Sequence, residues 1–381
     1  MADPAPRVPA RHLARYPPQM PAHTLDREAL DHAFDVAGRR ARTGELPFVI
    51  LGVANAAGTI RLEAVTAPGA ERRVGTGAVC LLASITKPIV ATAALRLVAE
   101  GALGLKAPLA DWLPELAGDD RSRITAWHVL THTTGLDEAS LESLIRAGID
   151  RDGLLERTLA QPVVAAPGSR FRYVTFTFEL LALAMERATG EPLPQILRRT
   201  VLDPVGMADT VFEPRPDHAG RMAPVTIGEW DGTRLAGSED PAIAAAMRDA
   251  YTALRLAGGG LWSTADDLLR FGRAMLRGGE LDGRRVLAPA FVDLATREVT
   301  VDGLGRAEDR LLDEHYALGW GKPGPAHPAS ARAFGHGGAS GTRLWIDPAH
   351  DLVVVYLSSS WGMPGAVIDE PLFAVYAATR N

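Results

Sequence analysis

Several features are scarce or missing in this chain of 381 residues, and each absence excludes a class of protein. The single cysteine, Cys80, excludes an internal disulfide and a cysteine-based metal cluster. Acidic residues outnumber basic ones by 46 to 40, which argues against a nucleic-acid partner. The most apolar region, residues 80–105, is interrupted by Lys87, Arg96 and Glu100, so it is too broken to span a bilayer.

Motifs of other enzyme classes are also absent. No Gly-x-Ser-x-Gly segment occurs, which removes the α/β-hydrolase interpretation. His128 and His132 have the spacing of metal ligands but lack the adjacent Glu of zinc proteases. Residues 319–324 match the Gly-x-Gly-x-x-Gly motif of dinucleotide sites, but they are followed by prolines rather than by the helix that such a site needs. We therefore expect no metal and no cofactor.

The N-terminal segment is rich in proline and has no long apolar stretch. Six prolines fall within the first 21 residues, so residues 1–23 are expected to form a flexible arm. A secretion signal would need an apolar segment here. We therefore expect a cytoplasmic protein.

The residues that are present indicate a globular fold with strands at both ends. Hydrophobic residues make up 47% and charged residues 23% of the chain, which excludes disorder as the main state. The patterns predict strands at residues 47–53, 59–65, 316–320, 333–336, 342–346 and 352–357. They predict helices at residues 24–42, 84–100, 176–189 and 373–379. The run at 352–357, Leu-Val-Val-Val-Tyr-Leu, is apolar throughout and is predicted to be central in the sheet.

This distribution predicts an α/β (α+β) fold whose antiparallel sheet is built from both termini and flanked by helices. Residues 24–88 and 249–381 would form the sheet-containing domain. Residues 89–248 would form an inserted, mainly helical domain that carries substrate-site loops. The stretch 213–241 holds four prolines and four glycines and is expected to be one such loop.

The helix beginning at Ser84 carries the most informative pair of residues. Lys87 lies one turn after Ser84, so both side chains share a face of an otherwise apolar helix. Only three of the 40 basic residues are lysine, and a buried lysine, unlike arginine, can lose its proton and accept one from a serine hydroxyl. The alternative is a capping serine beside a lysine that reaches solvent, and the pair alone favours that alternative.

An ordered set of segments adds to this pair. Ser84-Ile85-Thr86-Lys87 resembles the Ser-x-x-Lys motif of the serine β-lactamase and penicillin-binding protein superfamily. Further segments resemble its class C-like branch, which includes family VIII carboxylesterases and transacylases, and they occur in the same order: 130–136, 171–175, 258–268 and 335–338. The resemblance covers about residues 24–380 and implies a β-lactamase/transpeptidase-like fold.

The resemblance also implies roles for individual residues. Ser84 would be the nucleophile, Lys87 its base, and Tyr173 a second proton-transfer group. The backbone N–H groups of Ser84 and Ala339 would form the oxyanion hole. The substrate-binding positions would be occupied by Thr175, which could equally cap the following helix, and by His336, Gly337 and Gly338.

Two departures from the family pattern bear on the substrate. Thr175 stands at the position of the family's Asn, and His336-Gly337-Gly338 replaces its usual Lys-Thr-Gly. We therefore predict a serine hydrolase, a carboxylesterase or acyltransferase, that acts on a small ester or amide without nucleic-acid or membrane partners. One alternative is a β-lactamase or D-amino-acid peptidase. Another is a non-catalytic acyl-ligand or peptide-binding protein on the same scaffold.

Overall fold

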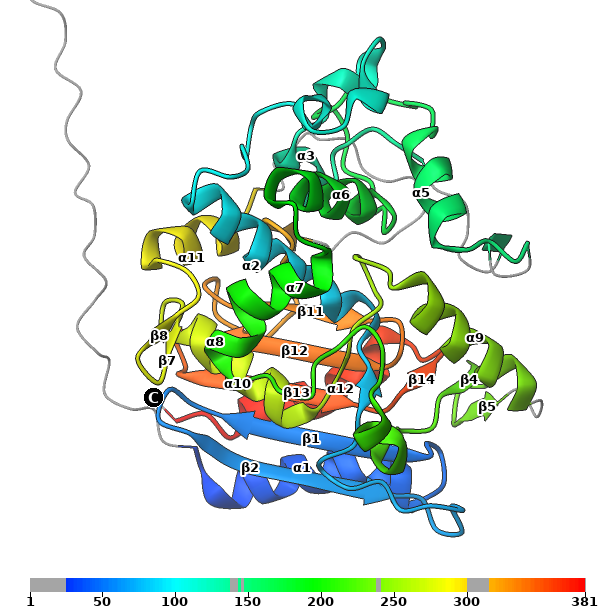
Figure 1. Cartoon of the computed structure of the whole chain (residues 1–381). Helices are drawn as coiled ribbons and strands as arrows, with labels where there is room; N and C mark the ends of the chain where they lie inside the picture. Colours follow the sequence, from blue (N-terminus) through cyan, green and yellow to red (C-terminus); the bar gives the residue numbers. More distant parts are fainter. Residues whose placement is uncertain (1–24, 138–142, 145–146, 238–240, 300–314, 381) are drawn as a thin grey trace, which may run out of the picture.

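The central sheet of the fold takes its strands from both ends of the chain. The computed structural model describes residues 25–137, 143–144, 147–237, 241–299 and 315–380. In these residues the main sheet has seven antiparallel strands in the order β2-β1-β13-β12-β11-β10-β9. The strands are β1 Phe48–Ala54, β2 Thr59–Thr66, β9 His315–Tyr316, β10 Gly321–Lys322, β11 Phe334–Gly338, β12 Thr342–Asp347 and β13 Leu352–Leu357. Because β1 pairs with β13, the two ends of the chain meet inside the sheet, which confirms the predicted fold class (Figure 1).

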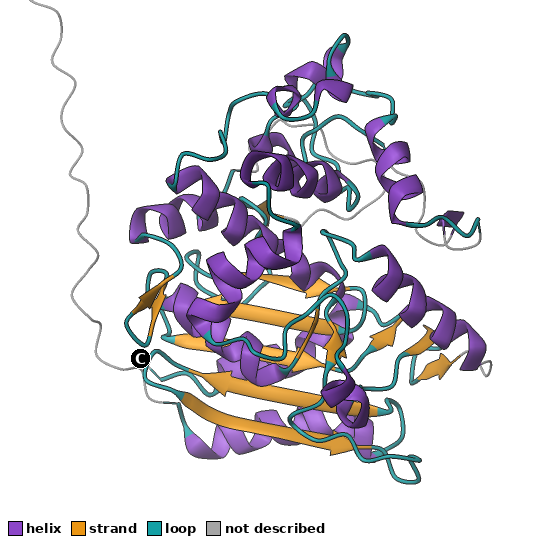
Figure 2. Ribbon diagram, viewed as in Figure 1, coloured by secondary structure: helices purple, strands orange, loops and turns teal. Residues whose placement is uncertain are grey.

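Strand β13 is buried on both of its faces, which explains its uninterrupted apolar sequence. Val353 and Val355 pack on the face covered by α10, Ala265–Leu276. Val354 and Tyr356 pack on the opposite face, which is covered by α1, Arg27–Arg42, and α12, Gly365–Ala377. Figure 2 shows this layered arrangement of helices and strands. The prediction that this strand is central in the sheet is confirmed.

Most of the remaining helices lie between β2 and β9 in the sequence. The helices are α1 Arg27–Arg42, α2 Thr86–Ala99, α3 Ala126–Leu130, α5 Arg151–Leu159, α6 Thr177–Thr189, α7 Leu193–Leu197, α8 Asp203–Val205, α9 Pro241–Leu254, α10, α11 Pro289–Thr296 and α12 Gly365–Ala377. Short helical turns are η1 Ala83–Ile85, η2 Leu109–Asp111, η3 Pro114–Leu116, η4 Asp120–Arg123, η5 Arg198–Leu202 and η6 Pro216–Arg221. None of the helices in the described part of the chain is long and apolar enough to cross a membrane.

The predicted domain limits fall inside two of these helices. The limit at 88/89 lies in α2 and the limit at 248/249 lies in α9. The division into a sheet domain and a helical domain therefore remains a proposal about how the chain is organised. The predicted N-terminal arm, residues 1–23, lies outside the described residues.

Three local predictions differ from the structure. The helix predicted at 373–379 is the C-terminal part of α12, which spans Gly365–Ala377 and continues through Pro371. The expected loop at 213–241 contains η6 and two strands, β4 Thr226–Trp230 and β5 Leu235–Gly237, which form a small sheet with β14 Ser360–Trp361. The predicted strand at 316–320 ends at Tyr316, because the chain turns through Gly319 with φ +77° before β10 begins. Further short strands pair as β3 Cys80–Leu81 with β6 Trp262–Ser263, and β7 Glu280–Leu281 with β8 Arg284–Arg285.

Candidate active site

Ser84 and Lys87 lie together at the start of α2, in the interior of the molecule. Ser84 belongs to the single turn η1 that precedes α2, and the Lys87 side chain is completely buried. Lys87 Nζ lies 3.1 Å from Ser84 Oγ, 3.3 Å from Thr175 Oγ1 and 2.8 Å from the carbonyl oxygen of Gly258. The amine is therefore held in one position against the serine hydroxyl by groups from two other segments of the chain.

The backbone before Ser84 has a strained conformation. Ala83 has φ +48°, in the left-handed region that costs a residue with a Cβ roughly 1–2 kcal/mol. Such strain persists only where the surroundings hold it, and it concentrates at functional sites. Here the surroundings are provided by Leu261, whose N–H bonds to Thr86 Oγ1 at 3.1 Å and whose carbonyl accepts the Leu82 N–H at 2.9 Å.

The segment that accepts the Lys87 bond is itself tightly positioned. A Cβ on Gly258 would lie 2.6 Å from the Thr175 carbonyl oxygen, so only glycine fits there. The neighbouring Ala257 N–H donates at 2.6 Å to Glu179, a fully buried carboxyl in α6 that also lies 3.3 Å from Arg151. Burial raises the pKa of Glu179 to about 7, although Arg151 and the backbone N–H groups act to lower it. A buried acid thus supports the loop that holds Lys87.

The end of strand β11 lies against the segment that leads into Ser84. Thr342 Oγ1 donates to the Leu82 carbonyl at 2.9 Å, and this clamps the β11–β12 turn onto the chain two residues before Ser84. A Cβ on Gly338 would lie 2.2 Å from both the Leu82 oxygen and Thr342 Oγ1. A Cβ on Gly338 would also lie 3.3 Å from the Cβ of Ala83, the residue before Ser84, and Ala339 directly follows Gly338 at the end of the strand.

Tyr173 forms another wall of the site, in the segment that leads into α6. Lys87 Nζ lies 4.7 Å from the centre of the Tyr173 ring. The His132 ring stacks on that ring with centroids 4.3 Å apart, and His132 Nδ1 accepts the backbone N–H of Val174 at 3.1 Å. His132 has φ +54°, a left-handed conformation that directs the chain in the turn after α3. One histidine therefore fixes both the ring and the backbone around Tyr173.

His336 on β11 has both ring nitrogens bonded within the protein. Its Nε2 lies 2.8 Å from the Tyr316 hydroxyl, and its Nδ1 lies 2.6 Å from the carbonyl oxygen of Gly337. Burial, together with the nearby Lys87 charge, lowers the pKa of His336 to about 3, so the ring is neutral at pH 7. Burial and the same charge hold the pKa of His132 well below its usual value.

Most of the predicted site residues converge on this region. Ser84, Lys87 and Thr175 are in contact, and Tyr173 and Gly338 lie beside them. Thr175 does not cap α6, because the residue at the cap position is Phe176. Gly337 faces the other side of the sheet, where a Cβ would lie 2.2 Å from Arg343 Nη1, opposite it in register on β12.

A model of a known protein family matches nearly the whole chain. The model, described as Beta-lactamase, matches residues 39–378. The chain belongs to the beta-lactamase family. Among curated members, esterase EstB of Burkholderia gladioli is 33% identical over 334 residues, which cover 78% of this chain and 81% of EstB. The D-alanyl-D-alanine-carboxypeptidase/endopeptidase AmpH of Escherichia coli K12 is 25% identical, with coverage of 88% of this chain and 83% of AmpH.

A solved structure of the family agrees with the observed fold. EstCE1, described as a hydrolase with promiscuous acyltransferase activity, superposes with a TM-score of 0.76 and is 25% identical. The match covers 92% of this chain and 99% of EstCE1. The family assignment predicted from the ordered motifs is confirmed by these matches.

Sequence reasoning did not assign a role to several residues that the structure places at the site. From the sequence, His132 stands out only by its spacing from His128 and as part of segment 130–136, Gly258 only as part of segment 258–268, and Tyr316 only as the start of a strand. A left-handed turn in the segment 130–136 could have suggested that His132 points inward. Nothing in the sequence indicates that Tyr316 reaches the site, because its contacts come from elements 184 and 20 residues away.

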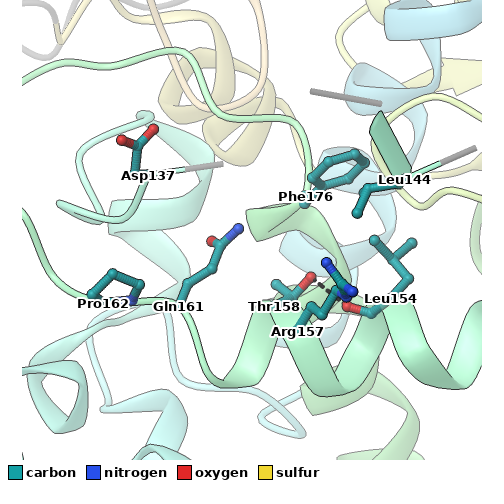
Figure 3. A pocket seen from close by; sticks show the side chains of 8 residues that line it. All are labelled: Asp137, Leu144, Leu154, Arg157, Thr158, Gln161, Pro162 and Phe176. Atoms are coloured by element: carbon teal, nitrogen blue, oxygen red, sulfur yellow. Dashed lines mark hydrogen bonds between the residues drawn. The ribbon is translucent and has the colours of Figure 1, made fainter. Parts of the chain in front are cut away.

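A pocket of about 320 Å³ opens beside the first turn of α6 (Figure 3). Phe176 forms part of its wall and directly follows Thr175, which contacts Lys87. Leu144 and Leu154 provide further apolar surface, while Arg157 and Gln161 provide polar groups at the wall. The helical part of the chain therefore contributes a mixed apolar and polar cavity next to the residue that holds Lys87.

A possible metal-ligand group lies away from this site. Ligand atoms of Asp209, Asp217 and His218 lie within 4.8 Å of one another. Asp209 already forms ion pairs with Arg221 at 2.7 Å and with Arg215 at 3.4 Å. The guanidinium groups supply the positive charge that a cation would otherwise bring, so this group fits a surface ion-pair network.

Proposed function

We propose that this member of the beta-lactamase family is a carboxylesterase or acyltransferase that works through an acyl-enzyme on Ser84. The observation that carries the proposal is the buried Lys87 amine, which lies 3.1 Å from Ser84 Oγ. Unlike an arginine, this lysine can lose its proton and then accept one from the serine. A binding protein has no physical need for a buried lysine beside a serine. The esterase EstB and the hydrolase EstCE1, both similar to this chain, support the same chemistry.

The proposed reaction begins with transfer of the Ser84 hydroxyl proton to the Lys87 amine. Ser84 Oγ then attacks the substrate carbonyl carbon, and the resulting oxyanion is stabilised by the backbone N–H groups of Ser84 and Ala339. Tyr173 passes a proton to the leaving alcohol or amine as the tetrahedral intermediate collapses to the acyl-enzyme. Water or an alcohol then attacks the acyl carbon and gives its proton to the Tyr173 oxygen, while Ser84 leaves as the hydroxyl after it takes back the proton held by Lys87.

We further propose that the substrate is uncharged near its reacting carbonyl. His336 is neutral, and both of its ring nitrogens are already bonded to Tyr316 and Gly337. Arg343 cannot replace the family's usual lysine here, because it lies on the opposite face of the sheet and pairs with Asp369 at 2.5 Å. A substrate carboxylate buried at this strand would lack a cation, which is costly. A neutral ester needs only the nucleophile, its base and the oxyanion hole.

The test combines covalent labelling with a comparison of substrates. A fluorophosphonate probe should label Ser84, identified by peptide mass spectrometry, and Ser84→Ala should abolish labelling and turnover. Ser122→Ala, which removes a hydroxyl from the distant turn η4, is the matched control and should behave as wild type. Labelling that persists in Ser84→Ala would contradict the proposed nucleophile.

Substrate preference is measured on the same preparation. We expect kcat/KM for p-nitrophenyl butyrate to exceed the values for penicillin G and nitrocefin. If either β-lactam matches or exceeds the ester, the argument from His336 and Arg343 is wrong, and hydrolysis of a charged substrate, such as a β-lactam or a peptide ending in D-alanine, becomes the better assignment.

A further inference from the structure

Tyr316 lies between two buried histidines that come from distant parts of the chain. Its hydroxyl is 3.2 Å from His132 Nε2 and 2.8 Å from His336 Nε2, and its side chain is almost fully buried at the end of β9. His132 comes from the turn after α3, and His336 comes from β11. One hydroxyl therefore connects the helical part of the molecule with the sheet.

The hydrogen-bond partners assign the ring protons of both histidines. His132 Nδ1 accepts the Val174 N–H, so the His132 proton must be on Nε2, where it donates to the Tyr316 oxygen. His336 Nδ1 faces the Gly337 carbonyl and must donate to it, so His336 Nε2 accepts the Tyr316 O–H. All four contacts are satisfied by this single arrangement, which runs in one direction from His132 through Tyr316 to His336.

The arrangement requires both rings to be neutral. A second proton on His132 would place an N–H on Nδ1 against the Val174 N–H, and a second proton on His336 would place an N–H on Nε2 against the Tyr316 O–H. The groups whose charge acts on these rings are cations when charged: Lys87 in its protonated state on both rings, His336 on His132, and Arg343 on His336. Their repulsion and the burial of the rings oppose protonation, in agreement with the proton positions that the contacts require.

Each histidine holds one wall of the candidate active site. His132 stacks on the Tyr173 ring and binds the N–H of Val174, the residue that follows Tyr173. His336 binds the Gly337 carbonyl, and this peptide group precedes Gly338 and Ala339 at the proposed oxyanion hole. A change in the tautomer or the angle of either ring would therefore move a group that the proposed reaction uses.

We propose that Tyr316 is a positioning residue whose hydroxyl fixes the tautomers of His132 and His336. Through these two rings it holds Tyr173 and the Gly337–Ala339 segment in fixed positions relative to each other. The inference rests on the proposed acyl-transfer function of Ser84. It also gives His336 a role other than substrate binding, because the ring has no N–H left to offer a substrate. The class of substrate that this arrangement disfavours is again one with a carboxylate near the reacting carbonyl.

The test compares Tyr316→Phe with a matched variant. Tyr376→Phe removes the same hydroxyl from a buried tyrosine on the opposite face of the sheet, where it bonds Asp347 at 3.0 Å and Trp345 at 3.1 Å. Tyr316→Phe should lower kcat for p-nitrophenyl butyrate about tenfold to hundredfold with little change in KM, because a misplacement of about 1 Å can cost on the order of 10² in rate. Tyr376→Phe should leave kcat unchanged.

Histidine NMR supplies a readout that a purely structural role would not move. In the wild-type protein, ¹⁵N shifts should show neutral rings from pH 5 to 8, with the proton on Nε2 of His132 and on Nδ1 of His336. In Tyr316→Phe, His336 loses the donor that stabilises its neutral form, so its pKa should rise and a new acid limb should enter the kcat profile.

Two results would overturn the inference. One is the opposite tautomer, or a protonated ring, in the wild-type protein between pH 5 and 8, a measurement that does not depend on the variant folding. The other is a Tyr316→Phe protein with the kcat and pH profile of Tyr376→Phe. Fluorophosphonate labelling of wild-type Ser84 separates the two proposals, because absent labelling counts against the acyl-enzyme while the histidine tautomers still report on Tyr316.

Discussion

Replacement of Lys87 by arginine should inactivate the protein although the positive charge is kept. Arginine cannot release its proton at accessible pH, so Lys87→Arg removes the proposed base while retaining a cation. A positioned general base contributes typically about 10²- to 10⁴-fold, which corresponds to roughly 2.7–5.5 kcal/mol of barrier. We expect kcat/KM for p-nitrophenyl butyrate to fall by at least 10²-fold.

The geometry adds a second, separable effect of this substitution. The Lys87 side chain is completely buried, with Nζ fixed between Ser84 Oγ, Thr175 Oγ1 and the Gly258 carbonyl. A planar guanidinium is larger than the space this amine occupies, and overpacking costs typically about 1–3 kcal/mol of stability. We therefore expect a lower melting temperature as well as lost turnover.

The assay must separate these two effects. Activity is measured well below the melting temperature of each variant, and the rate of fluorophosphonate labelling is followed in parallel. Lys87→Met, which is similar in length and neutral, should fold and also be inactive. Lys106→Arg makes the same exchange at an exposed lysine and should behave as wild type. If Lys87→Arg keeps activity within about tenfold of wild type, Lys87 supplies only positive charge and the proposed mechanism is wrong.

Three further changes test separate parts of the site. Tyr173→Phe keeps the ring and removes only the hydroxyl, so kcat should fall by about 10²-fold or more. Gly338→Ala would place a Cβ 2.2 Å from the Leu82 oxygen, so turnover should fall about 10²-fold, whereas Gly58→Ala, with open space around it, should have no effect. Burial raises the pKa of Glu179 to about 7, so the folded protein binds this proton more tightly than the unfolded chain does. The free energy of unfolding gained from this group is therefore present at low pH and is lost as the pH rises through 7. Glu179→Gln cannot ionise, so its melting temperature relative to wild type should rise between pH 5 and 8; a constant difference would contradict the shift.

The sequence by itself predicts the fold and the proximity of Ser84 and Lys87. The run 352–357 is apolar at every position, which is typical of a strand buried on both faces. Ser84 and Lys87 are three residues apart, so local geometry alone brings them to one face whatever surrounds them. The ordered segments then indicated the family, which the match over residues 39–378 confirms.

Interactions between distant segments had to come from the tertiary structure. The contact between Lys87 and the Gly258 carbonyl joins residues 171 positions apart, and no periodicity encodes such a pairing. The expected loop at 213–241 contains strands because Ser360 and Trp361 lie beside β4, which the local composition does not reveal. Local patterns carry information about residues a few positions apart in the sequence. A contact between distant segments depends instead on how all the elements of the fold pack together.

The substrate argument shows this division most clearly. The sequence shows that His336-Gly337-Gly338 lacks the lysine and hydroxyl of the family pattern, but it does not show whether a cation nearby, such as Arg343 on the following strand, takes the place of that lysine. The structure answers this point, because residues paired directly across antiparallel strands share a face, and Arg343 pairs with Gly337 rather than with His336. A one-residue difference in register turns the arginine to the α12 side, where Asp369 binds it. Register is a property of the assembled sheet, so the sequence identifies these residues, and only the sheet determines which of them lie on the side of Ser84 and Lys87.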